Sequence, residues 1–278
     1  ATRARKVQNI MMHPSTRQCM DIADQHLLRN NPVQRADISN AENIYGSNLG
    51  ALKGKTVTRK GVTVDGQITG VPPAIKHKFR TVTICLDIMF INKIPFLLTT
   101  SRGPHFGAVE NLKDRHAPTI CKALQRAIAQ HARRGFKITT AHADPEFEPL
   151  QAELGQIQFN FCAQNEHVPE IERFIRTVKD RVRSGCDNQP FSRIPRLMII
   201  RLVSNAVFWL NAFPHSDGAS STLSPQCLLT GKHLDFNKHV RAEFGSCAQP
   251  HEQHATDMNA RTLSTSPLSP SYDAHHRP

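Results

Sequence analysis

The order of apolar patterns between residues 81 and 212 constrains the fold of this chain more than any other feature. Runs rich in Ile, Val, Thr and Phe predict strands at residues 81–90, 94–100, 105–111, 136–143 and 156–162. Apolar residues at helical spacing predict helices between Pro118 and Gly135, at 168–184 and at 196–212. This order of strands and helices predicts a mixed α/β domain.

The composition on either side of this region predicts four segments. Residues 1–79 are polar and basic, and we expect a loosely packed arm with one helix near residues 16–28. Residues 80–215 form the predicted core. A small segment with short strands is expected at 216–247. Residues 248–278 are rich in His, Ser, Thr and Pro and have little to bury, which predicts a disordered tail.

The formal net charge of +12 indicates a polyanionic partner, of which nucleic acid is the commonest. The seven cysteines are scattered and form no Cys-x-x-Cys pair, which argues against a disulfide framework and against a zinc finger. Charged residues interrupt both of the most apolar stretches, so we expect no membrane partner.

Three acidic residues occur in settings that can bring them together. Asp87 lies inside the first predicted strand, Asp144 ends the fourth, and Glu172 opens a basic amphipathic helix. Converging carboxylates hold Mg²⁺, and Mg²⁺ on a basic protein indicates phosphodiester chemistry on nucleic acid.

Each of the two aspartates also has a structural interpretation. Asp87 could be an edge acid paired with a lysine, although an unpaired acid in so apolar a run is costly to bury. Asp144 could be the N-cap of a short helix that begins at Pro145, and a cap can also be a metal ligand. Glu146 and Glu148 either neighbour the metals or belong to that helix.

The third acid has three candidates, namely Glu172, Glu170 and Glu166, of which we favour Glu172. The buried stripe of this helix is predicted to contain Ile171, Phe174, Ile175, Val178 and Val182. Beside the stripe, Glu172 shares a face with three basic residues, which are Arg176, Lys179 and Arg183. An acid at the head of a basic face suits a groove that binds phosphates, whereas the simpler alternative is a Glu–Arg pair along the helix.

We expect six basic residues to contact nucleic acid. Four lie on the predicted helix and two in a basic N-terminal loop, and the full set is Arg173, Arg176, Lys179, Arg183, Lys53 and Lys55. Such contacts would be made to the phosphate backbone without reading bases.

The order of the three acids resembles that of DDE transposases and retroviral integrases. Residues 94–113 look like the hairpin that follows the first aspartate in integrases of copia-like retrotransposons, and residues 144–147 and 170–177 resemble their second and third acidic segments. Residues 206–214 and 224–231 are similar to the downstream segments of the same family.

This resemblance implies a ribonuclease H-like mixed five-stranded sheet flanked by helices, followed by an SH3-like β module at residues 216–247. It implies 3′-end processing and strand transfer of retrotransposon DNA, with two Mg²⁺ or Mn²⁺ ions held by Asp87, Asp144 and Glu172. The implied partners are element ends and target DNA, with no small-molecule substrate. A homo-oligomer and residence in the nucleus are also implied.

Two alternatives remain open from the sequence. One is an inactive integrase remnant that only binds nucleic acid, and the other is a ribonuclease H-like nuclease that never joins ends. Glu172 follows Asp144 by 28 positions (172 − 144), which is shorter than usual in retroviral integrases and favours the remnant. Retention of all three acids favours an enzyme.

Overall fold

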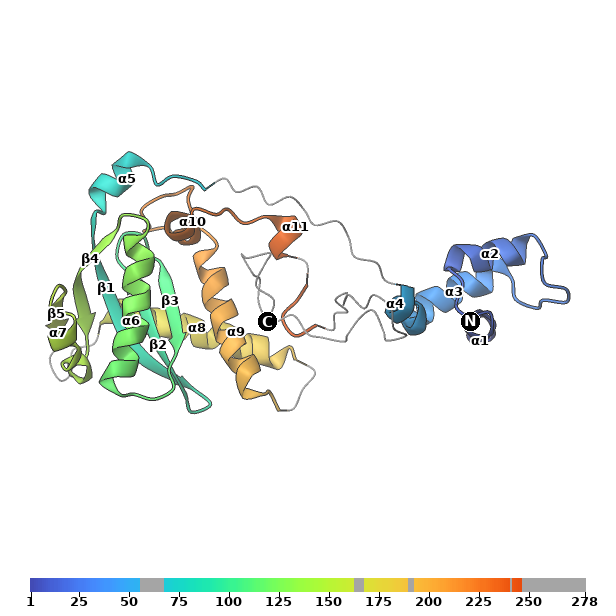
Figure 1. The fold of residues 1–278 in the computed structure, drawn as a ribbon, viewed down its shortest axis with the longest axis horizontal. Coiled ribbons are helices and arrows are strands. Elements are labelled where there is room, and N and C mark those ends of the chain that lie inside the picture. The colour runs from blue at the N-terminus through green and yellow to red at the C-terminus, as the bar shows by residue number, and fades with distance from the viewer. Residues whose placement is uncertain (56–67, 163–167, 190–192, 241, 247–278) are drawn as a thin grey trace, which may run out of the picture. The chain divides into compact units, whose positions relative to one another are not determined.

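The computed structural model describes residues 1–55, 68–162, 168–189, 193–240 and 242–246 (Figure 1). The chain divides into two compact units near residue 63, and each is described by itself. Within the described ranges, no helix combines the length and the apolar character needed to cross a membrane.

The N-terminal unit is helical. Its elements are α1 (Thr2–Ile10), α2 (Thr16–Asp24), α3 (Arg35–Tyr45) and α4 (Leu49–Lys55). The start of α2 is fixed by a capping box, in which Ser15 accepts a hydrogen bond from the Gln18 backbone and Gln18 binds the Ser15 backbone in return. The sequence predicted only one helix in this segment, near residues 16–28, whereas the described residues of this unit form four, so the prediction was wrong about the extent of helix.

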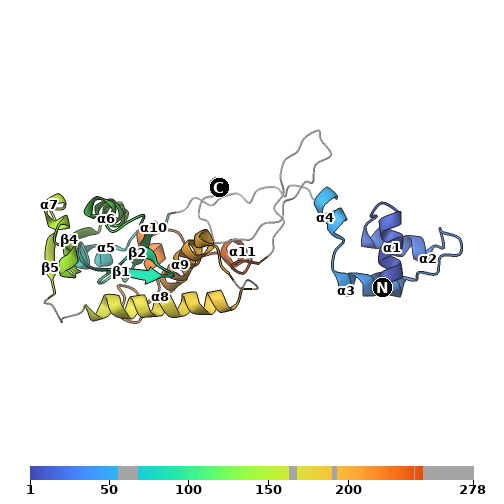
Figure 2. The ribbon, with the colours of Figure 1, turned by 90° about the horizontal axis from the view of Figure 1, so that it is seen from below.

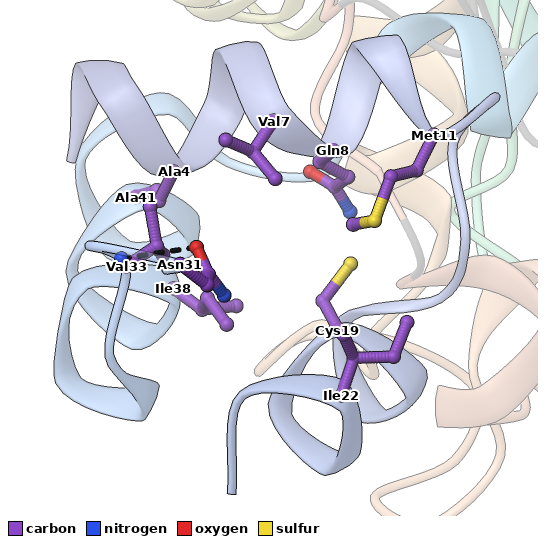
Figure 3. Close-up of a pocket in the computed structure, with 10 residues that line it drawn as sticks. All are labelled: Ala4, Val7, Gln8, Met11, Cys19, Ile22, Asn31, Val33, Ile38 and Ala41. Atoms are coloured by element: carbon purple, nitrogen blue, oxygen red, sulfur yellow. Dashed lines mark hydrogen bonds between the residues drawn. The ribbon is translucent and has the colours of Figure 1, made fainter. Parts of the chain in front are cut away.

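The first three helices bury a small cluster of short side chains. Figure 3 shows Ala4, Cys19, Val33, Ile38 and Ala41 around one small apolar pocket, and these five are also the buried residues of the cluster. Because most of them are small, the sequence lacks the strong apolar periodicity that signals a core, and a loose arm was predicted instead.

The second unit is built on a sheet of five strands in the order β3-β2-β1-β4-β5. The strands are β1 (Thr81–Ile91), β2 (Ile94–Ser101), β3 (Gly107–Asn111), β4 (Lys137–Ala143) and β5 (Gln158–Phe161). The pairs β1–β2 and β2–β3 are antiparallel, whereas β1–β4 and β4–β5 are parallel. This is a mixed five-stranded sheet in the predicted arrangement, and that prediction is confirmed.

Helices cover both faces of the sheet. The longer ones are α6 (Ala117–Ala132), α8 (Pro169–Asp187) and α9 (Arg196–Asn211). Figure 2 shows α6 and α8 on opposite sides of the strands. Alternation along β1 sends Ile84 and Leu86 into the core beneath α6, and Cys85 and Met89 into the core beneath α8 and α9.

The predicted stripe of α8 is confirmed. Ile171, Val178 and Val182 are buried, with Phe174 and Ile175 half-buried beside them. A Cβ atom on Gly107 would lie 2.2 Å from the Phe174 ring, so α8 packs directly on the β3 backbone.

Short helices complete this unit. They are α5 (Pro73–Lys78), the 3₁₀ helix η1 (Pro145–Phe147), α7 (Leu150–Glu153), α10 (Pro225–Thr230) and α11 (Phe236–His239). The small β segment predicted at 216–247 was wrong, because α10 and α11 and no strand occupy its described residues. Ser224 caps α10 by accepting a hydrogen bond from the Cys227 backbone, and Gly231 ends it at φ 73°. The tail at 248–278 lies outside the described residues.

Candidate metal and nucleic-acid site

The parallel pairing of β1 with β4 brings Asp87 next to Asp144. The register aligns Ile84 with Ala141 and ends with the pair Cys85 and His142, and two further residues along each chain lead to Asp87 and to Asp144. Both aspartates fall on the face that α8 covers, because side chains alternate along a strand and Cys85 lies in the core beneath α8. The two carboxylates therefore lie at the end of the paired segment of two inner strands, on the face of the sheet that α8 covers.

Asp87 is half-buried among other acids. Its Oδ1 accepts a hydrogen bond from the Ile88 backbone at 2.6 Å. Burial, together with the smaller effect of the negative charges of Asp144, Glu146 and Glu172, raises the pKa of Asp87 to about 6 against the opposing effect of that hydrogen bond. Asp144 and Glu172 thus both lie within electrostatic range of Asp87.

This raised pKa predicts how the stability of the fold depends on pH. The folded state disfavours ionised Asp87, so its stabilising contribution is complete below the ordinary pKa of 3.8 and is lost as the pH rises through about 6. We therefore expect Asp87→Asn to raise the free energy of unfolding more at pH 7.5 than at pH 3.5. The expected difference between the two effects is ~1 kcal/mol after allowance for solvent screening.

Urea unfolding of the wild type and Asp87→Asn in EDTA at both pH values measures this difference. Asp217→Asn, which removes the same charge from an exposed loop, controls for net charge. A gain that is equal at the two pH values would show that the pKa of Asp87 is not raised in the folded state.

Asp144 occupies the N-cap position of η1 with its backbone only. Its φ of −72° and ψ of 159° are those of a cap, but the carboxylate makes no capping hydrogen bond. The structural interpretation of Asp144 as a side-chain cap is therefore not supported, and the helix does not use the carboxylate.

Glu170 and Glu172 lie on opposite flanks of the buried stripe of α8. Glu170 accepts hydrogen bonds from the Arg102 guanidinium at 2.8 and 3.1 Å and from Cys85 Sγ at 3.3 Å. The Arg102 contact lowers the pKa of Glu170, whereas burial raises the pKa of Cys85 to about 12. Glu172 is exposed and contributes to the field at Asp87, which favours it as the third acid. Glu166 lies outside the described residues.

Glu146 belongs to this group of acids. The sequence left two interpretations of Glu146, as a neighbour of the metals or as part of the short helix. Glu146 acts on Asp87, and it forms an ion pair with Arg115, whose guanidinium also lies 5.6 Å from the Phe90 ring centroid. The two-residue spacing from Asp144 is the signal by which it could have been assigned to the site.

The donor set suits a hard divalent cation. It consists of carboxylate oxygens, which are the preferred ligands of Mg²⁺ and Mn²⁺, and the charges of Asp144, Glu146 and Glu172 all act on Asp87, so that a cation there would be attracted by several acids. In the part of the chain that the structure describes, no three His, Cys, Asp or Glu side chains are already close enough together to hold an ion. The acids therefore have the chemistry that a divalent cation requires, but they do not form a closed ligand shell around one.

The predicted basic residues fall into two sets. Arg173 and Arg176 are exposed on α8, and Lys179 and Arg183 line an open groove further along the helix. Lys53 and Lys55 belong to α4 of the N-terminal unit, so the predicted loop is a helix there, and their side chains lie outside the described residues.

No protein-family model matches this sequence, and no curated protein matches it either. Among solved structures, the chain is similar to the catalytic core domain of BIV integrase, with 15% identity and a TM-score of 0.38. The match covers 53% of this chain and 92% of that one. At this distance, the description of the fold rests on the strand order and register of the chain itself.

Proposed function

We propose that this protein carries out metal-dependent phosphodiester chemistry on DNA, as a polynucleotidyl transferase with Asp87, Asp144 and Glu172 as its acidic site. The observation that supports this most is the parallel pairing of β1 with β4, which leads Asp87 and Asp144 to the end of the paired segment, together with the action of the Asp144 and Glu172 charges on Asp87. The net charge of +12 suits a nucleic-acid substrate.

Asp87, Asp144 and Glu172 would hold two Mg²⁺ or Mn²⁺ ions, which activate the nucleophile and stabilise the leaving oxygen when bound. Glu146, held by Arg115, adds negative charge beside them. Arg176, Lys179 and Arg183 follow Glu172 along the exposed side of α8, where they would contact backbone phosphates and orient the strand.

The order of the sequence segments supports a narrower proposal, an integrase of a copia-like LTR retrotransposon. Such an enzyme would process the 3′ ends of element DNA and join them to target DNA. A homo-oligomer and residence in the nucleus belong to the same proposal, and so does the assignment of DNA as the partner.

The inactive remnant is the second candidate, and one observation favours it. Within the described ranges, the acids do not form a ready ligand set for an ion. A remnant would bind DNA with a steep dependence on salt and without any requirement for a divalent cation.

A labelled duplex oligonucleotide, incubated with Mg²⁺ or with Mn²⁺, separates the candidates by product length. Products longer than the substrate indicate strand transfer, and shorter products alone indicate a nuclease. Binding without products, over several end sequences and in both metals, would leave the remnant as the function of the chain.

A further inference from the structure

Arg102 links the first turn of α8 to two strands of the sheet. Its guanidinium donates to both carboxylate oxygens of Glu170, at 3.1 and 2.8 Å, and Cys85 Sγ donates to the same carboxylate at 3.3 Å. Cys85 is fully buried on β1, and Arg102 follows directly after β2. The carboxylate of Glu170 is therefore held from two neighbouring strands.

The backbone that carries Arg102 is itself fixed. The Arg102 N–H donates to the Thr83 carbonyl on β1 at 2.8 Å, and the Gly103 carbonyl accepts a hydrogen bond from the Ala219 N–H at 2.8 Å. The planar guanidinium is pre-organised for a carboxylate, so it loses little freedom for each hydrogen bond that it forms. Arg102 thus connects α8 to the sheet through a short and well-defined contact.

This contact lies on the flank of α8 opposite Glu172. Successive residues of a helix are about 100° apart, so Glu170 and Glu172 are about 200° apart, with the buried Ile171 between them. Burial of one stripe holds the helix against the sheet, whereas rotation about the helix axis is resisted mainly by contacts on the flanks. The contact at Glu170 therefore influences where Glu172 stands on the other flank.

We propose that Arg102 is a positioning residue of the acidic site, which acts through Glu170 to hold Glu172 where it can bind the same cation as Asp87. The inference rests on the proposed function for the identity of that site. Metal ligands depend on supporting contacts for their orientation, and loss of such a contact typically weakens metal affinity by about 10- to 100-fold.

Removal of the Arg102 side chain separates positioning from charge. Arg102→Ala removes a positive charge that repels a nearby metal ion, and it frees the negative charge of Glu170. Both electrostatic changes favour the binding of a cation, whereas displacement of Glu172 weakens it. Weaker binding by Arg102→Ala is therefore a result that positioning predicts and that charge alone does not.

Isothermal titration calorimetry of the full chain with Mn²⁺ tests the proposal. We expect Arg102→Ala to raise the dissociation constant for Mn²⁺ by about tenfold. Arg102→Lys keeps the charge but not the planar fork of donors, so it should recover only part of the loss. In the Glu170→Gln background, Arg102→Ala should cost less than in the wild type, because the two residues act through one contact.

Arg126→Ala is a matched control. The Arg126–Glu110 pair has the same N–O distance of 2.8 Å as the Arg102–Glu170 pair, and its arginine is 57% exposed against 48%. This pair joins α6 to β3 and does not involve α8. Arg126→Ala also removes one positive charge, and it should bind Mn²⁺ as the wild type does. Exposed ion pairs contribute little to stability, so circular dichroism should show that all variants are folded.

Three results would overturn the proposal. In the first, Arg102→Ala binds Mn²⁺ as tightly as Arg126→Ala. In the second, Arg102→Lys binds no better than Arg102→Ala. In the third, Arg102→Ala costs as much in the Glu170→Gln background as in the wild type. Each of these leaves the proposed function intact, because the wild type binds the cation. Absence of Mn²⁺ binding in the wild type would instead remove the proposed site and this inference with it.

Discussion

Replacing Asp144 by Asn is expected to lower the rate of metal-dependent cleavage or joining of DNA at least about a thousandfold, which corresponds to about 4 kcal/mol of lost transition-state stabilisation. Asn keeps the size of the side chain but removes the charge that a cation requires. Since η1 makes no side-chain capping bond to Asp144, the fold should remain intact.

The measurement is the initial rate on a labelled duplex in Mg²⁺ and in Mn²⁺, together with the unfolding midpoint. Asp87→Asn should lose activity to the same extent, because Asp87 lies within electrostatic range of Asp144 and is proposed to hold the same ions. Asp217→Asn removes a carboxylate from an exposed loop and should keep the wild-type rate. Turnover close to that of the wild type in both Asp87→Asn and Asp144→Asn would refute the assignment of the site.

Glu172→Gln and Glu170→Gln are expected to differ in activity by at least about tenfold, although the two residues are only two positions apart. Glu172→Gln should lose activity at least a hundredfold, because it removes a proposed ligand. Glu170→Gln should keep activity within about tenfold of the wild type, since this carboxylate binds Arg102 and Cys85 on the other flank of α8.

The cost of Glu170→Gln should appear in stability instead. The Arg102–Glu170 pair is partly exposed, so its loss is expected to lower the free energy of unfolding by about 1 kcal/mol or less. Rates and urea unfolding of both variants make the comparison. The reverse pattern, with Glu170→Gln inactive and Glu172→Gln active, would transfer the third acid to Glu170.

The sheet and its long helices could be predicted because their patterns are strong. The alternation of β1 separates Leu86 from Asp87, and the 3.6-residue stripe of α8 includes Ile171, Val178 and Val182. Because β1 and β4 are parallel neighbours, Asp87 and Asp144 each lie two residues beyond the aligned pair Cys85 and His142. The two acids are therefore expected to lie close together.

The remaining elements could not be predicted because their signals are short or weak. The N-terminal helices bury side chains as small as Ala4 and Ala41, which give little periodicity. The helix α10 has a cap at Ser224 and a stop at Gly231, but only six residues between them, and a run of that length is compatible with a strand.

The choice between Glu170 and Glu172 stays a prediction, to which the structure adds the neighbours of each acid. Helical spacing places the two acids on different flanks of one buried stripe, and only the neighbouring strands decide which flank faces Asp87. Arg102, at the end of β2, binds Glu170 and so identifies the other flank. The sequence alone does not show that Arg102 reaches α8 from 68 positions away.

Binding of Mn²⁺ to the wild type and to single variants, followed by isothermal titration calorimetry, tests the central claim most directly. That claim is that Asp87, Asp144 and Glu172 form one cation site. We expect binding by the wild type and by Glu170→Gln, and its loss in Asp87→Asn, Asp144→Asn and Glu172→Gln. Absence of Mn²⁺ binding in the wild type, or equal binding by all four variants, would contradict it.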